Sequence, residues 1–215
     1  MLKQHVIEVI EKNGIIAIAR GSSTDEVLAV AEALHAGGIR VFEVTCNSPG
    51  FLDSIKALKE SFGDRMQIGA GTVTNPVLAE LVLQAGADFV LAPDFDPAVI
   101  AAVHEKKRLM IPSVTTPTEV IQAHRLGVDL LKLFPASGLG PSYLKDLLGP
   151  FPEAALIPVG GISLDNLAAF ARAGAFAFGV GGSLLKKTWI DGEDWAALSR
   201  EAEKYVAAFK ENRRK

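Results

Sequence analysis

The stretch from residue 14 to residue 38 reads GIIAIARGSSTDEVLAVAEALHAGG and holds a strand pattern, a turn and a helix pattern in that order. Its first part, Gly14–Arg20, is a continuous apolar run, as parallel strands covered on both faces require. Ser23 and Glu26 have capping-box spacing, which marks a helix start. Apolar residues recur at helical spacing through Thr24–His35, and the glycine pair that follows ends the helix. The stretch therefore predicts one strand–helix unit.

The same unit recurs along the chain, about every 20–27 residues. Asn75, Asp96 and Thr116 each precede a proline at the first helical position, which marks three further helix starts. Eight units predict a single domain over residues 1–215 with the α/β (β/α)8 TIM-barrel fold and an extra N-terminal helix, Lys3–Lys12. An open doubly wound sheet is the alternative. The predicted strands are Gly14–Arg20, Val41–Thr45, Met66–Gly71, Phe89–Ala92, Leu109–Pro112, Leu130–Phe134, Ala155–Val159 and Ala175–Val180.

The composition excludes several classes of function. Apolar residues make up 49% of the chain and charged residues 22%, which is typical of a soluble globular protein. A net charge of −3 and a pI of about 5.8 favour neither nucleic acid nor an anionic membrane as a partner. One cysteine, Cys46, excludes an internal disulfide, and there is no signal-peptide or membrane-helix pattern. We therefore expect a cytoplasmic protein.

In barrels of this fold the active site lies at the carboxyl ends of the strands, and Lys132 lies near such an end. It is the only lysine inside a predicted strand, in the apolar run Leu130–Phe134. Burial pushes a lysine toward its neutral form, which is a nucleophile toward carbonyl carbon. The alternatives are a lysine that reaches solvent from a strand end or one that is paired with a carboxylate.

Glu43 is the only carboxylate in the middle of a predicted strand, Val41–Thr45. An unpaired buried carboxylate has a raised pKa, which suits a group that both donates and accepts a proton near neutrality. Glu43 and Lys132 could form a structural ion pair, or an imine-forming amine with its proton shuttle. We favour the second interpretation, because a buried pair is weak evidence for stability and both residues stand where barrel sites are built.

Two glycine pairs follow the last two predicted strands, Gly160-Gly161 and Gly181-Gly182, and Ser163 and Ser183 close them. In these barrels the same two loops commonly hold a phosphate, because glycine lets backbone N–H groups approach the anion. Glycine is also needed for tight turns, so each pair alone is a weak signal. Two pairs at the two expected positions predict a phosphate site.

Arg20 ends the first predicted strand, where it could hold a substrate carboxylate or pair with a neighbouring helix. All four histidines fall in predicted helices, away from strand ends and from ligand spacing. We therefore expect no metal and no cofactor.

These motifs together resemble one family. The sequence is similar to the 2-keto-3-deoxy-6-phosphogluconate/4-hydroxy-2-oxoglutarate aldolases, which are short class I aldolase barrels. The resemblance covers nearly the whole chain in the right order. The matching segments are Ile18–Arg20, Phe42–Thr45, Gly69–Val73, Lys132–Ala136, Pro158–Ser163 and Gly181–Ser183.

The resemblance implies a role for each candidate residue. Lys132 would form the Schiff base with the keto carbon, and Glu43 would act as general acid and base through a water. Thr72 would help to hold the carboxylate, while Pro93 and Phe134 would form pocket walls. The family is typically a metal-free homotrimer. The phosphate would lie against the two glycine loops, namely Gly160, Gly161, Gly181, Gly182 and Ser183.

One position departs from the pattern of the phosphogluconate-specific members, which carry an arginine where this chain has Asn47. The segment around Asn47 looks more like the 6-phosphogalactonate branch, so the C4 stereopreference stays open, as does the choice between Arg20 and Asn47 for the carboxylate. The sequence predicts a lyase that releases pyruvate and D-glyceraldehyde 3-phosphate from a phosphorylated keto-deoxy sugar acid. The alternatives are 4-hydroxy-2-oxoglutarate as the main substrate, or a metal-free sugar-phosphate isomerase or epimerase.

Overall fold

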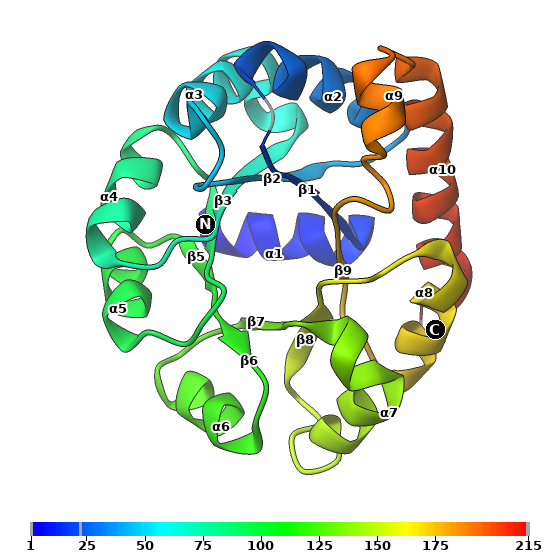
Figure 1. Cartoon of the computed structure of the whole chain (residues 1–215). Coiled ribbons are helices and arrows are strands. Elements are labelled where there is room, and N and C mark those ends of the chain that lie inside the picture. Colours follow the sequence, from blue (N-terminus) through cyan, green and yellow to red (C-terminus); the bar gives the residue numbers. More distant parts are fainter. Residues whose placement is uncertain (1, 22, 214–215) are drawn as a thin grey trace.

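The computed structural model describes residues 2–21 and 23–213, which form an α/β fold with a curved parallel sheet at the centre and helices around it (Figure 1). Six strands pair in the order β5-β4-β3-β2-β1-β9 and three in the order β6-β7-β8, and all these pairings are parallel. A single bridge, Val159 to Gly179, links the end of β8 to β9. The strands are β1 Ile15–Ala19, β2 Val41–Thr45, β3 Gln67–Gly71, β4 Phe89–Leu91, β5 Leu109–Ile111, β6 Ser113–Val114, β7 Leu130–Leu133, β8 Ala155–Pro158 and β9 Phe178–Val180.

Four helices begin where the sequence marks a start, directly after Ser23, Asn75, Asp96 and Thr116. Ser23 with Glu26, and Thr116 with Glu119, form capping boxes, and Asn75 caps its helix through its side chain. The helices are α1 Leu2–Asn13, α2 Thr24–Ala36, α3 Phe51–Phe62, η1 Gly63–Arg65 (3-10), α4 Pro76–Gln84, α5 Pro97–Glu105, α6 Pro117–Arg125, α7 Ala136–Leu148, α8 Leu164–Ala173, α9 Lys187–Asp191 and α10 Trp195–Asn212.

The predicted fifth strand, Leu109–Pro112, forms β5 up to Ile111, and a further short strand, β6, begins after Pro112. Proline has no N–H, so it cannot donate a hydrogen bond to the ladder at this position. The Pro112 carbonyl still accepts a hydrogen bond from the backbone N–H of Lys132, at 2.9 Å. The chain therefore keeps a hydrogen bond to β7 at Pro112, although Pro112 itself belongs to neither β5 nor β6.

Three apolar core clusters lie on the two faces of the strands, and the smallest packs β6, β7 and β8 against α6 and α7. The largest core packs the strands against the surrounding helices. The inner core lies between the strands themselves, and Val6 and Ile10 of α1 belong to it together with Ile16, Val41 and Leu109. These strand residues stand at or near the amino ends of β1, β2 and β5, so α1 covers that end of the sheet. The carboxyl ends are left open for a site. No helix in the described ranges is long and apolar enough to cross a membrane.

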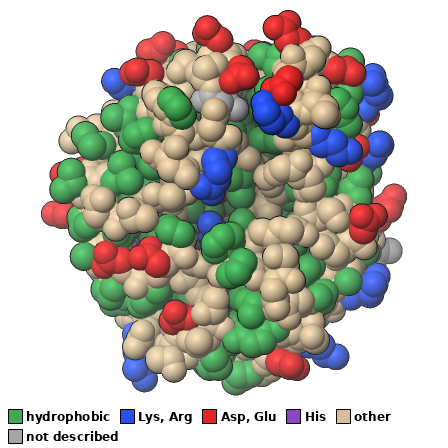
Figure 2. Space-filling view, in the orientation of Figure 1, with side chains coloured by type: hydrophobic (Ala, Val, Ile, Leu, Met, Phe, Trp, Pro, Cys, Tyr) green, Lys and Arg blue, Asp and Glu red, His purple; other side chains and the backbone are tan. Residues whose placement is uncertain are grey.

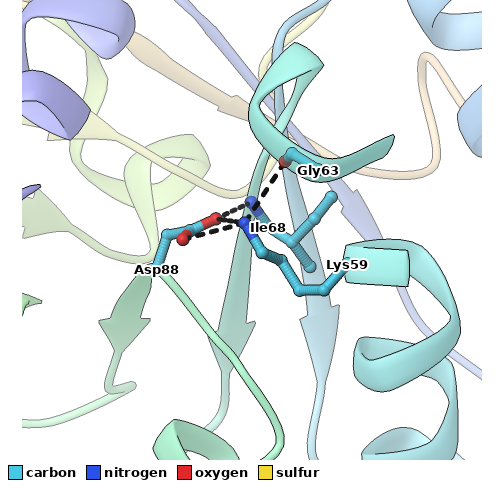
Figure 3. Close-up of polar contacts among 4 residues, drawn as sticks. All are labelled: Lys59, Gly63, Ile68 and Asp88. Atoms are coloured by element: carbon cyan, nitrogen blue, oxygen red, sulfur yellow. Dashed lines mark hydrogen bonds and ion pairs between the residues drawn. The ribbon is translucent and has the colours of Figure 1, made fainter. Parts of the chain in front are cut away.

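A partly buried ion pair stabilises the amino end of β4. The Asp88 carboxylate accepts hydrogen bonds from the Lys59 ammonium at 2.7 and 3.0 Å and from the backbone N–H of Ile68 at 2.9 Å (Figure 3). Lys59 also donates to the Gly63 carbonyl at 3.3 Å. The pair therefore ties α3 to β3 and β4, with each charged group directly partnered.

Candidate active site

Lys132 lies in the middle of β7 with its side chain on the inner face of the sheet. It pairs in register with Ser113 on one side and Ile157 on the other, and the residue is only 6% exposed. Its ammonium lies 4.8 Å from the ring centroid of Phe134. Burial lowers the pKa of Lys132, the nearby Glu43 carboxylate opposes that change, and Arg20 adds to it. This environment favours the neutral, nucleophilic amine.

Glu43 lies in β2 and is 1% exposed. Its register partner in β3 is Gly69. A Cβ atom at Gly71 would overlap the Glu43 carboxylate, so the absence of a side chain at that position leaves the space that the carboxylate occupies. Burial raises the pKa of Glu43, and the positive charges of Lys132 and Arg20 oppose the rise. The Oε2 atom has no hydrogen-bond partner among residues 2–21 and 23–213.

Lys132 and Glu43 influence each other electrostatically without forming an ion pair. Each contributes to the pKa shift of the other, yet no Lys132–Glu43 contact within 4.0 Å occurs in the described part of the chain. Lys132 and Glu43 therefore do not form the structural ion pair that was the alternative interpretation. The arrangement instead places a buried amine and a buried carboxylate near each other without a direct pair.

A cavity of about 700 Å³ opens at the carboxyl ends of β1, β7, β8 and β9. Figure 2 shows Lys and Arg atoms near the middle of this face. Arg20 reaches the cavity from the end of β1, and Phe134 from the end of β7. Because Phe134 also contacts Lys132, one cavity wall lies beside the amine. The predicted phosphate residues all line this cavity, namely Gly160, Gly161, Gly181, Gly182 and Ser183.

The two glycine loops are tied together and leave backbone donors free. Gly161 has a φ of 73°, and a Cβ there would come within 2.5 Å of the Ser137 Cβ, so packing as well as conformation requires glycine. The Ser183 hydroxyl donates to the Ile162 carbonyl, which joins one loop to the other. The N–H groups of Gly161, Gly182 and Ser183 donate to no other described residue. Such donors at a cavity edge can hold an anion.

Lys132 and Glu43 are not among the residues that line this cavity, and three further predicted residues stand at strand ends outside its lining. Thr72 follows β3, is half-buried and has a φ of 59°. Left-handed backbone is costly for a β-branched residue and is typical of functional sites. Pro93 follows β4 and is half-buried, while Asn47 follows β2 and is exposed. All three therefore belong to the same end of the sheet as Lys132.

The cavity also contains charged residues that sequence reasoning missed. Glu26, Lys187 and Asp191 line it from α2 and α9, and Lys187 pairs with Asp191 at 2.6 Å. They lie in helices beyond the loops, so a search confined to strand ends does not include them. Three or more metal-ligating side chains of the His, Cys, Asp and Glu types come together nowhere in the described ranges.

Comparison with known proteins gives one family. The model of the family described as KDPG and KHG aldolase matches residues 6–201. The chain is 33% identical to the 2-dehydro-3-deoxy-6-phosphogalactonate aldolase of Escherichia coli, over 92% of this chain and 95% of that protein. It is 36% identical to the 2-dehydro-3-deoxy-phosphogluconate aldolase of Pseudomonas aeruginosa, over 88% of this chain and 86% of that protein.

Solved structures give the same result. The KDPG aldolase of Legionella pneumophila, with pyruvate captured at low pH as a covalent carbinolamine intermediate, has a TM-score of 0.87 and 28% identity, over 93% of this chain and 97% of that chain. A cube-shaped, highly porous protein cage, designed by fusing symmetric oligomeric domains, has a TM-score of 0.85 and 31% identity, over 93% of this chain and 73% of that chain.

Proposed function

The chain belongs to the KDPG and KHG aldolase family, and from that premise we propose that Lys132 is the amine on which its reaction takes place. The protein is a class I aldolase, a carbon–carbon lyase. It cleaves 2-keto-3-deoxy-6-phosphogluconate, or the 6-phosphogalactonate epimer, to pyruvate and D-glyceraldehyde 3-phosphate. The observation that carries the role of Lys132 is its burial beside the cavity with a lowered pKa.

The reaction begins when the neutral Lys132 amine attacks the C2 carbonyl carbon of the substrate. The carbinolamine that forms loses water and becomes a protonated imine. Loss of the C4 hydroxyl proton then breaks the C3–C4 bond, and the electron pair of that bond moves into the imine to give an enamine. The aldehyde product leaves, the enamine takes a proton at C3, and hydrolysis releases pyruvate and the free amine.

Glu43 carries the protons of these steps. Its raised pKa and its unpartnered Oε2 atom support that role, because the group must take up and return a proton near neutral pH. The absence of a direct Lys132–Glu43 contact leaves room for an intervening water to relay the proton. Arg20 reduces the cost of a negative charge on Glu43, which keeps the carboxylate accessible as a base.

The two ends of the substrate are held at opposite sides of Lys132. The free N–H groups of the loops at Gly161 and Gly182 support phosphate binding there, together with the Ser183 N–H. Arg20, Thr72 and Asn47 bind the carboxylate end. Pro93 and Phe134 form apolar walls on either side of the reacting carbons.

The choice between the two sugars is not fixed by overall similarity. The relatives named for the galactonate and gluconate substrates are 33% and 36% identical to this chain. Asn47 supports the galactonate epimer, because a neutral amide replaces the arginine of the phosphogluconate-specific pattern. We propose that both epimers are cleaved and that position 47 sets their ratio.

We further propose that the two sheets form one closed eight-stranded (β/α)8 barrel, which spans residues 1–215 as a single domain and assembles as a homotrimer in the cytoplasm. The Val159–Gly179 bridge and the short interruption at Pro112 support closure. The designed cage built from symmetric oligomeric domains supports a symmetric assembly. Native mass spectrometry measures the subunit number directly, and a monomer would contradict this proposal.

Pyruvate release tests the proposed reaction. We expect the protein to release pyruvate from both epimers, measured by a coupled lactate dehydrogenase assay, and the Lys132→Met variant to release none above background. Lys56→Met, at an exposed position in α3, is the matched control and should keep full activity. Substrate loss without pyruvate would instead indicate an isomerase or epimerase.

A further inference from the structure

A second cavity, of about 420 Å³, lies at the opposite end of the molecule from Lys132. It is bounded by α1, α10, η1 and the amino ends of β2 and β3, and its volume suits a small-molecule ligand. We propose that this cavity binds a small anion with at least two negative charges, of the phosphate ester or pyrophosphate class. This site is separate from the proposed active site and does not depend on it.

The charge of the cavity is the first reason. Lys12, Arg40, Arg65 and Lys210 line it, and Asp64 is its single carboxylate. None of these five forms an ion pair within the described ranges. A cluster of free cations in a protein whose net charge is −3 concentrates positive potential at one concave place. Such a place attracts a multiply charged anion more strongly than a singly charged one.

A buried amide is the second and independent reason. Gln67 opens β3, is 3% exposed and lines the same cavity. Its backbone N–H donates to the Arg40 carbonyl, while its side-chain amide makes no hydrogen bond to a described residue and has its atoms open to the cavity. The neighbouring Asn13 differs, since its amide pairs with the Gly38 carbonyl and the Arg40 N–H. An amide that faces the cavity with free N–H donors can donate a hydrogen bond to an oxyanion bound there.

The two arginines are already held in place. The Arg40 Nη1 atom donates to the carbonyls of His35 and Ile39, at 2.7 and 2.8 Å, and leaves its other N–H groups without a described partner. The Arg65 guanidinium lies 5.1 Å from the Phe62 ring centroid and donates to the Ser61 carbonyl at 2.6 Å. Guanidinium groups fixed in this way lose little entropy when they bind an oxyanion.

Binding at this cavity should also stabilise the fold. The lining joins α1 and α10 to the start of β3, and α1 covers the amino ends of the strands. A ligand that binds the folded protein alone raises its apparent stability with concentration. The proposal therefore predicts both local binding and a rise in Tm.

Pyrophosphate is a suitable probe. We expect titration with sodium pyrophosphate to shift the Gln67 side-chain amide signals in ¹⁵N NMR spectra and to raise Tm at the same concentrations. The Lys12→Gln/Lys210→Gln double variant should bind at this site at least about tenfold more weakly, because two charges that face the anion are lost. Lys106→Gln/Lys145→Gln, which removes two exposed charges outside the cavity, is the matched control and should bind as the wild type does.

Gln67→Met keeps the length of the side chain and removes its hydrogen-bonding groups. It should weaken binding, as measured by the shifts of the Arg40 and Arg65 guanidinium signals. The glycine amides of the active-site loops report any pyrophosphate bound there, so the two sites are read separately. The proposal is overturned if Gln67 does not shift at millimolar pyrophosphate, or if the control pair weakens binding as much as the Lys12/Lys210 pair.

Discussion

This protein has two lysine–carboxylate pairs with low solvent exposure, and they differ in direct contact and in hydrogen bonding. Lys59 and Asp88 touch at 2.7 Å, and Asp88 also accepts a backbone N–H, so both charges are satisfied (Figure 3). Lys132 and Glu43 are both buried, make no ion pair with each other in the described ranges, and have shifted pKa values. The first pair ties elements of the fold together, whereas the second is the pair to which we assign the proposed chemistry.

The difference follows from where each pair lies along the strands. Asp88 immediately precedes β4, at the amino end of the sheet and away from the cavity at the carboxyl ends. Glu43 and Lys132 point into the space between the strands near their carboxyl ends. Gly71 leaves room for the Glu43 carboxylate but gives it no partner. The same two residue types are therefore directly paired in one place and left unpaired in the other, according to their surroundings.

Replacing Lys132 by methionine should give the largest effect. We expect kcat to fall by at least about 10⁴-fold, because the nucleophile is lost and the remaining groups cannot form an imine. The free energy of unfolding should fall by no more than about 1 kcal/mol, since methionine fills a similar volume and removes a buried charge. Steady-state kinetics and urea unfolding measure the two effects. A large loss of stability would mean that Lys132 is a structural residue.

Glu43→Gln is expected to be the next largest change. Loss of the proton carrier should lower kcat by about 10²–10⁴-fold, the usual range for general acid–base catalysis. Glu80→Gln, at an exposed position in α4, is the matched control and should have wild-type kinetics. Equal rates for Glu43→Gln and the wild type would assign the proton transfer to another group.

Asp88→Asn should lower the stability of the protein and leave its activity nearly unchanged, the opposite of the Lys132 and Glu43 variants. The change leaves Lys59 without its charged partner, so the free energy of unfolding should fall by about 2–3 kcal/mol, less than for a fully buried pair because Lys59 is partly exposed. The kcat of the folded variant should stay within about twofold of wild type, because the site is distant. A fall in kcat without a fall in stability would erase the distinction between the two pairs.

The pH dependence of stability should give a smaller effect. Folded Glu43 has a pKa above its ordinary 4.5, so the folded state binds more protons and loses stability as pH rises from 4.5 through the raised pKa. Lys132 has a folded pKa below 10.5, so stability rises with pH between that lowered pKa and 10.5. Glu43→Gln should abolish the first change, about 1.4 kcal/mol per unit of pKa shift. If the free energies of unfolding of the variant and the wild type differed by the same amount at all pH values, this expectation would be contradicted.

The sequence was sufficient to predict the strand positions and the burial of Lys132 and Glu43 within two of these strands. Each strand is an apolar run, and β2 occupies the predicted Val41–Thr45 without change. Lys132 and Glu43 could be recognised because a charge inside such a run is costly and therefore conspicuous. The division of β5 from β6 was not predicted, although the missing N–H of Pro112 explains it.

Other features depend on residues that only the fold brings together. Lys59 and Asp88 are 29 positions apart, and nothing in the sequence around either residue indicates that the two form an ion pair. In the sequence, Gly71 is only one small residue in a short run of small residues. That run does not show that the Glu43 carboxylate occupies the space beside Gly71. The basic cavity at Gln67 draws its lining from four separate segments, so no local pattern marks it.

Covalent trapping tests the central claim most directly. The protein is incubated with pyruvate and sodium borohydride, digested and mapped by mass spectrometry. If Lys132 forms the imine, reduction should attach the three-carbon acid to Lys132 irreversibly, abolish activity and leave Lys59 unmodified. An adduct on another lysine, or complete inactivation with an unmodified Lys132, would contradict the account.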